Sequence, residues 1–127
     1  MQQRGTVIGI RELSSQETAD KAPPAEALSF DNLGLSESML ETLRRVEYLA
    51  PTPIQAGLIP KALTGADLMG QARTGTGKTA AFGIPILERL EPHKSGQGPQ
   101  ALVLVPTREL AVQVRGEIDK LSQGKKV

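Results

Sequence analysis

Cysteine and tryptophan are absent from this 127-residue chain, and two phenylalanines and one tyrosine are its only aromatic residues. Without cysteine, the chain can form neither disulfides nor thiolate metal sites. So few aromatic side chains argue against a platform on which nucleic-acid bases stack. The net charge of +1 at pH 7 neither requires nor excludes a polyanionic partner.

Long apolar runs are also missing. No stretch approaches the roughly 18–20 consecutive apolar residues that a membrane-spanning helix needs, and the first residues lack the apolar centre of a signal peptide. The composition, 39% hydrophobic and 23% charged, is ordinary for a globular protein. We therefore expect one small cytoplasmic domain without a membrane partner.

The most informative pattern is residues 71–79, QARTGTGKT, which fits the phosphate-loop signature G-x-x-x-x-G-K-[ST] except that Ala72 replaces the first glycine. Gly75 and Gly77 allow backbone torsions that are closed to residues with a Cβ. Successive N–H groups can therefore curl inward and face anionic oxygens. The pattern predicts a site for a polyphosphate.

Side chains at the end of this loop complete the predicted site. Lys78 would bring a positive charge to the terminal phosphates, and Thr79 would offer a hydroxyl to Mg²⁺. Residues 66–70 are typical of a short buried strand and residues 80–87 of a helix, so a helix beginning near Gly77 would add its positive dipole end. A glycine-rich turn without a ligand is the alternative, but the strand–loop–helix order favours nucleotide binding.

Residues 1–28 have the composition of a flexible tail. The apolar cluster at residues 7–10 is too short to build on, and the rest is polar with a proline pair. Such a segment cannot bury enough surface to offset the entropy lost on ordering. We expect ordered structure to begin near Phe30, in a domain that spans residues 29–127.

Helix signals follow in close succession. Ser36 is a suitable N-cap for a helix that should end before Pro51. Thr52 and Pro53 are suited to the cap and first position of a second helix, which Gly65 would close. The helix after the phosphate loop should extend to about residue 90, with a bend where a proline interrupts it.

The continuous apolar run Ala101–Val105 predicts a strand that is buried on both faces of a parallel sheet. Pro106 would end this strand, and Thr107 would cap a last helix. The element order implies a parallel crossover, yet only two strands are predicted. The sequence therefore predicts the front half of an α/β domain with an incomplete parallel sheet.

The chain contains, in this order, Phe30 followed by Glu47–Gln55 (EYLAPTPIQ), then Ala72–Thr79 (ARTGTGKT) and Pro106–Leu110 (PTREL). These blocks resemble the Q motif, motif I and motif Ia of the DEAD-box family of ATP-dependent RNA helicases, over roughly residues 30–121. Alanine is usual at the first position of motif I in that family. Glu47 stands where the family usually has glycine, a departure that concerns the local turn geometry.

The resemblance implies a RecA-like P-loop NTPase domain that binds ATP and Mg²⁺. Gln55 would hydrogen-bond the adenine edge, Phe30 would pack against the base, and Thr52 would support the phosphate loop. Taken alone, Gln55 is better explained as a polar residue near a helix N-terminus, but the flanking Pro-Thr-Pro-Ile block and Phe30 favour the adenine contact. The implied phosphate-binding residues, with Lys78 and Thr79 as the catalytic pair and Thr79 as the magnesium ligand, are Ala72, Arg73, Thr74, Gly75, Thr76, Gly77, Lys78 and Thr79.

The resemblance also implies a sequence-independent contact between Pro106, Thr107 and Arg108 and the RNA backbone, because such contacts position a strand without reading bases. A simple pairing of Arg108 with Glu109 or with solvent is the alternative. RNA-processing proteins are further candidate partners.

Hydrolysis needs an acidic group that holds magnesium and orients the attacking water. The strand predicted at residues 101–105 is followed by proline and threonine, and the family's Asp-Glu-Ala-Asp block and second domain are not in the sequence. We therefore expect this chain alone to be inactive as an ATPase or helicase. Two alternatives are a short product that binds nucleotide or RNA without catalysis, and another phosphate-loop enzyme such as a kinase or DNA helicase.

Overall fold

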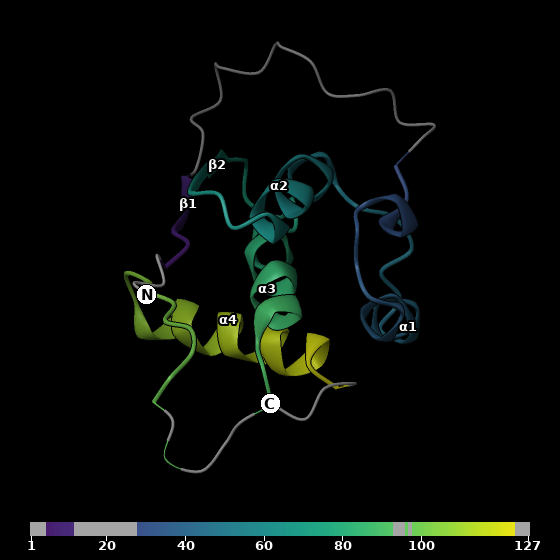
Figure 1. The fold of residues 1–127 in the computed structure, drawn as a ribbon. Helices are drawn as coiled ribbons and strands as arrows, with labels where there is room; N and C mark the ends of the chain where they lie inside the picture. The colour runs from purple at the N-terminus through teal and green to yellow at the C-terminus, as the bar shows by residue number, and fades with distance from the viewer. Residues whose placement is uncertain (1–4, 12–27, 93–95, 97, 124–127) are drawn as a thin grey trace.

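The structure is a computed structural model that describes residues 5–11, 28–92, 96 and 98–123 (Figure 1). Residues 1–4 and 12–27 of the expected tail lie outside the described residues. Ile8–Arg11, however, form strand β1, which corrects the expectation that this apolar cluster builds no structure. Partners distant in sequence stabilise it, since the Val7 N–H donates to Asp67 Oδ1 (3.0 Å) and the Thr6 hydroxyl to the Gly65 carbonyl (3.1 Å).

Helix α1 spans Glu37–Arg45 and follows a single 3₁₀ turn, η2, at Phe30–Asn32. As predicted, the Ser36 side chain caps α1 by accepting a hydrogen bond from the Met39 N–H. The helix ends well before Pro51, in a turn where Glu47 has a φ of 63°.

Helix α2 spans Pro53–Leu63, with Thr52 at the N-cap and Pro53 at the first position, as the sequence predicted. Gly65 follows with a φ of 85°, the left-handed conformation that glycine tolerates best. The chain then enters strand β2, Leu68–Gln71, close to the strand expected at residues 66–70.

The sheet consists of β1 and β2, which pair in parallel with Ile8 opposite Leu68 and Arg11 opposite Gln71. The prediction of an α/β fold with a parallel sheet is confirmed, but the strand predicted at residues 101–105 of that sheet is wrong. Residues 101–105 form no strand, and Leu102 and Leu104 are 81% and 84% exposed. The neighbour found beside β2 is β1, and the 101–105 run lies instead along the last helix, where it has no strand to pair with among the described residues.

Helix α3, Lys78–Arg89, begins directly after the phosphate loop and contains Pro85. Helix α4, Arg108–Leu121, is capped by the Thr107 side chain, which accepts a hydrogen bond from the Leu110 N–H (3.2 Å). Both helices start where the sequence predicted. None of the described helices is long and apolar enough to cross a bilayer.

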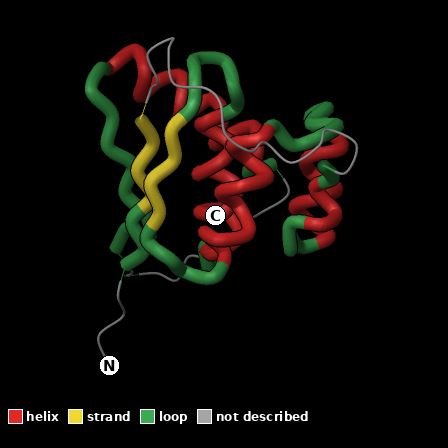
Figure 2. Tube along the Cα trace, turned by 90° about the horizontal axis from the view of Figure 1, so that it is seen from above, coloured by secondary structure: helices red, strands yellow, loops and turns green. Residues whose placement is uncertain are grey.

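Helix α3 is the centre of the fold. In Figures 1 and 2 the two strands lie on one side of the central helices and α1 lies on the other. Figure 1 shows α4 crossing the C-terminal half of α3. The buried core joins η2, α1, α2, α3 and α4 through Phe30, Leu33, Met39, Leu40, Leu43, Ile59, Ala80, Ile84, Leu87 and Leu121. This packing fixes the loop that precedes α3.

Candidate nucleotide-binding site

The phosphate loop joins the end of β2 to the start of α3. Gly75 and Gly77 have φ angles of 78° and 76°, which confirms the torsions predicted from their lack of a Cβ. Within the loop, the Thr76 hydroxyl donates to the Arg73 carbonyl at 2.6 Å. The backbone is therefore curled, as a loop that surrounds an anion must be.

Residues from the start of α2 are bonded directly to this loop. The Thr52 hydroxyl donates to the Thr76 carbonyl at 2.7 Å, and the Gln55 side chain donates to the Gly77 carbonyl at 3.2 Å. Gln55 is 1% exposed. A Cβ added to Gly77 would lie 2.3 Å from Gln55 Nε2, so the glycine is needed for close packing as well as for its torsions.

The Gln55 amide makes bonds at both ends. Its Oε1 accepts a hydrogen bond from the Thr52 N–H at 2.9 Å, which forms a capping box at the start of α2. A primary amide has two N–H donors and an oxygen with two lone pairs, so half of this capacity remains after these two bonds. A base that hydrogen-bonds Gln55 would use the remaining donor and lone pair, or would displace the bond to Gly77.

Lys78 folds back over the loop. Its Nζ donates to the Ala72 carbonyl at 3.2 Å, and Ala72 is itself 8% exposed. A polyphosphate would offer this ammonium group a charged acceptor, and charge-assisted hydrogen bonds are about twice as strong as neutral ones. Thr79 is half-buried in the first turn of α3.

Groups that suit a magnesium–nucleotide ligand are therefore present at the loop: the backbone N–H groups of a curled glycine-rich segment, an ammonium group and a hydroxyl. No cluster of three or more His, Cys, Asp or Glu side chains that could hold a metal occurs among the described residues. Because Mg²⁺ is usually bound through phosphates, water and one or two protein oxygens, this donor set suits a metal that arrives with its nucleotide.

Phe30 lies in the hydrophobic core with 5% of its surface exposed, and its ring centroid is 6.4 Å from that of Tyr48. Little of the ring is accessible to a base. Beside it, Asp31 is exposed, and a hydrogen bond from Ser29, followed by the charge of Arg44, lowers the pKa of its carboxyl group. These contacts hold η2 against α1 rather than against the loop.

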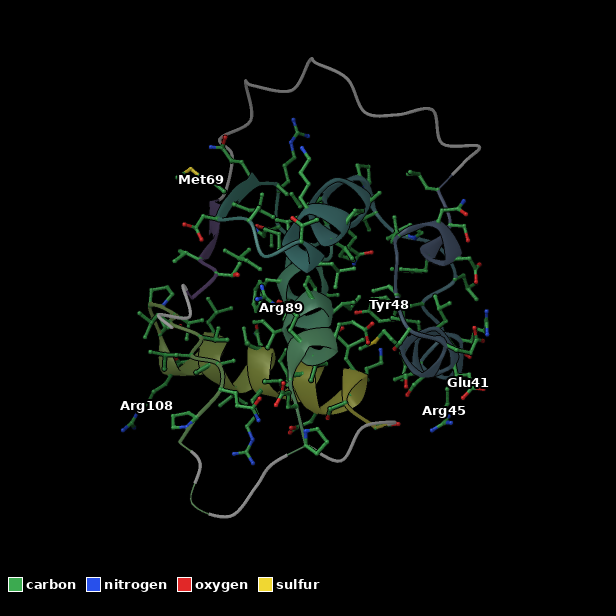
Figure 3. The ribbon with its side chains drawn as sticks, viewed as in Figure 1. Glu41, Arg45, Tyr48, Met69, Arg89 and Arg108 are labelled. Carbon is green, nitrogen blue, oxygen red and sulfur yellow. The ribbon has the colours of Figure 1, made fainter. Side chains whose placement is uncertain are left out.

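Pro106, Thr107 and Arg108 are all exposed at the N-terminal end of α4. Figure 3 shows Arg108 at the outer end of this helix, away from the region around Tyr48. The structure thus brings the 52–55 block and the phosphate loop together but leaves residues 106–108 as a separate exposed segment.

Sequence reasoning missed Tyr48, which proves to be a junction between segments. Its hydroxyl donates to Glu117 Oε1 on α4, and the Lys120 ammonium lies 5.0 Å from its ring centroid. The sequence offered one signal only: Tyr48 is the single tyrosine and stands shortly before the 52–55 block.

Comparisons with known proteins add independent information. A sequence profile of the DEAD/DEAH box helicase family matches residues 52–127. DEAD-box ATP-dependent RNA helicase CshA of Bacillus cereus is 50% identical over 99 residues, which are 78% of this chain and 18% of that protein. ATP-dependent RNA helicase DRS1 of Lodderomyces elongisporus is 46% identical over 109 residues, 86% of this chain and 16% of that protein. The chain thus spans less than a fifth of these curated relatives.

Solved structures agree with the sequence comparisons. A crystal structure of a DEAD box protein from the hyperthermophile Methanococcus jannaschii has a TM-score of 0.70 at 42% identity, over 79% of this chain and 27% of that one. The RNA helicase Prp28 from Chaetomium thermophilum bound to ADP has a TM-score of 0.70 at 44% identity, over 76% of this chain and 24% of that one. S. cerevisiae Dbp5 bound to RNA and ADP BeF3 has a TM-score of 0.72 at 35% identity, over 80% of this chain and 26% of that one.

Proposed function

Because this chain belongs to the DEAD/DEAH box helicase family, we propose that it binds ATP with Mg²⁺ and acts as the nucleotide-binding part of an ATP-dependent RNA helicase. The observation that carries the proposal is the pair of bonds from Thr52 to Thr76 and from Gln55 to Gly77. They make the 52–55 block and the phosphate loop one site. Family membership also removes the alternative of a kinase.

Each residue of the site has a task that its chemistry suits. The N–H groups of the loop and of the start of α3 would donate to the phosphates, and the dipole of α3 would add positive potential there. Lys78 moves from the Ala72 carbonyl to a phosphate oxygen. Thr79 would hold Mg²⁺, and the metal would supply neutralisation of charge on the phosphates. Gln55 bonds the adenine edge through its remaining donor and lone pair.

Hydrolysis and unwinding are proposed for a longer protein rather than for this chain alone. The chain has no acidic residue directly after its 101–105 apolar run, where Pro106 and Thr107 follow instead. Phosphoryl transfer depends on positioned acidic and cationic groups around the metal and water. Coverage of 18% and 16% of the curated helicases is consistent with a site to which other segments contribute.

Residues 106–108 are proposed to contact an RNA backbone without reading its sequence. Support comes from their exposure and from the positive charge of Arg108 at the start of a helix. The Thr107 hydroxyl already accepts the cap bond from Leu110, so it keeps its proton for donation to a phosphate.

Isothermal titration calorimetry with ADP and GDP tests the adenine site. The wild type should bind ADP more tightly, and Gln55→Ala should reduce this preference by at least about tenfold, since even one of the two lost hydrogen bonds corresponds to about 1.4 kcal/mol. Gln113→Ala, which removes an exposed glutamine from α4, is the matched control and should bind as the wild type does. Equal affinity of the wild type for both nucleotides would overturn the role given to Gln55.

A further inference from the structure

Helix α4 is held firmly near its C-terminal end. Ile118 packs so closely on α3 that a Cβ added to Gly83 would lie 2.7 Å from Ile118 Cδ1. Leu121 is buried in the core. On the neighbouring face, Glu117 accepts the hydrogen bond from the Tyr48 hydroxyl, and Lys120 lies over the Tyr48 ring. Two attachments, to α3 and to Tyr48, therefore meet in the same turn of α4.

The N-terminal half of α4 is less well supported. Residues 108–113, before the buried Val114, are all exposed or half-buried. An open hollow of about 230 Å³ lies between this helix and the 103–105 segment, lined by Val103, Val105, Ala111, Val114, Arg115 and Ile118. Few packed contacts therefore resist a displacement of this half of the helix. The N-terminal half of α4 can therefore tilt more easily than its C-terminal turn.

The length of the helix amplifies such a tilt. At 1.5 Å per residue, the stretch from Arg108 to Glu117 is about 14 Å long, so a rotation of about 4° at Glu117 displaces Arg108 by about 1 Å. The attachment at Glu117 thus governs the position of the proposed RNA-contacting end. Figure 3 shows this separation, with Tyr48 and Arg108 on opposite sides of α3.

Tyr48 also lies in the turn between α1 and the Thr52 cap of α2, which leads into the nucleotide site. Its ring packs against that of Phe30 at an interplanar angle of 56°. Thr52 and Gln55 are bonded to the phosphate loop. A shift of the turn when nucleotide binds therefore has a direct route to α4.

We propose that Tyr48 is a positioning residue that fixes the N-terminal end of α4 relative to the nucleotide site through its hydrogen bond to Glu117. Aromatic packing and the Lys120 cation add to this attachment. The part of the inference that concerns RNA rests on the proposed function, whereas the placement of α4 does not.

Pulsed electron paramagnetic resonance measures that placement directly. The sequence has no cysteine, so Lys61→Cys on α2 and Gln113→Cys on α4 give a uniquely labelled pair at exposed positions. The Tyr48→Phe and Glu117→Ala variants each remove one partner of the hydrogen bond and should each broaden or shift the distance distribution. Asp119→Ala removes a carboxylate of the same turn that faces Arg115 at 3.6 Å instead, and it should leave the distribution unchanged.

The single tyrosine and the absence of tryptophan provide a second readout. A hydrogen-bonded carboxylate quenches phenol emission, so Glu117→Ala should raise the tyrosine fluorescence whereas Asp119→Ala should not. Tyr48→Phe should also weaken binding of a uridine decamer by about fivefold, which corresponds to ~1 kcal/mol of lost preorganisation. ADP affinity should stay within about twofold of the wild-type value, because no nucleotide contact is removed.

Unchanged distance distributions in both Tyr48→Phe and Glu117→Ala would overturn the proposal, as would equal changes in Asp119→Ala. A combined Tyr48→Phe, Glu117→Ala variant should be no worse than either single variant, because both remove the same bond. If the wild type binds neither ADP nor the decamer, the proposed function is wrong, and the distance distribution still decides the positioning role.

Discussion

Replacing Glu47 with glycine should stabilise this protein. Glu47 occupies the left-handed region with a φ of 63°, in the turn that ends α1. The Tyr48 N–H bonds the Leu43 carbonyl at 2.9 Å and the Glu47 N–H bonds the Arg44 carbonyl at 3.2 Å, the two bonds of a Schellman motif. Glycine is the usual residue at this position because it has no Cβ to clash.

The expected gain follows from two opposing effects. A non-glycine residue in the left-handed region costs roughly 1–2 kcal/mol, and glycine loses about 0.5–1 kcal/mol more backbone entropy on folding. Glu47 is exposed, and its side chain makes no hydrogen bond or ion pair with another described residue. Glu47→Gly should therefore stabilise the fold by about 0.5–1 kcal/mol.

Urea unfolding measures the effect. With a slope of roughly 1.5 kcal/mol/M, the midpoint should rise by about 0.5 M without a change in slope. The matched control is Glu41→Gly, the same substitution at an exposed position inside α1. It should destabilise by about 1 kcal/mol, because glycine lowers helix propensity. The reasoning is refuted if Glu47→Gly lowers the midpoint as Glu41→Gly does.

Two further predictions concern the phosphate loop. Gly77→Ala should abolish ADP binding and destabilise the fold by roughly 1 kcal/mol or more through overpacking, because the new Cβ would lie 2.3 Å from Gln55 Nε2 at a φ of 76°. Calorimetry and urea unfolding measure the two effects, and Gly116→Ala, in open space on α4, is the control. Normal ADP binding by Gly77→Ala would contradict the close packing of Gly77 on Gln55. Lys78→Ala in a longer, active protein should weaken ATP binding and abolish turnover, and retained ATPase activity there would contradict the phosphate role.

Local signals predicted the helices well. Ser36, Thr52 and Thr107 are N-caps, which act on N–H groups within a few residues of themselves, and Pro53 has the fixed φ that suits a first helical position. Their effect can therefore be read from adjacent sequence. The torsions of the loop glycines are similarly local. These elements fix most of the candidate site, since the loop, its glycines and the start of α3 are contiguous in sequence.

Strand pairing was harder to predict because its partners are distant. The 101–105 run is apolar enough for a buried strand, yet hydrophobicity alone specifies no partner, and the run lies over α4. Strand β1 was missed because its anchors, Gly65 and Asp67, lie about sixty positions along the chain from Thr6 and Val7. Four apolar residues do not reveal such a pairing.

The bonds of Gln55 show the same limit at the site. Its amide predicts a group that can match a base, but the sequence could not reveal that Thr52 and Gly77 already use half of its capacity. The glycines of the loop, by contrast, were identified with their torsions. The hydrogen-bonding capacity of a side chain follows from its residue type, whereas the partners of that side chain are set by the fold.

The most direct test of a single site is a nuclear magnetic resonance titration with ADP and GDP in the presence of Mg²⁺. We predict that ADP shifts the Gln55 side-chain amide resonances and the Gly75 and Gly77 backbone resonances together, with one dissociation constant. GDP should shift the glycines with little effect on Gln55. If ADP moves the glycine resonances and leaves the Gln55 amide unchanged, Gln55 takes no part in nucleotide binding and the account of the site is wrong.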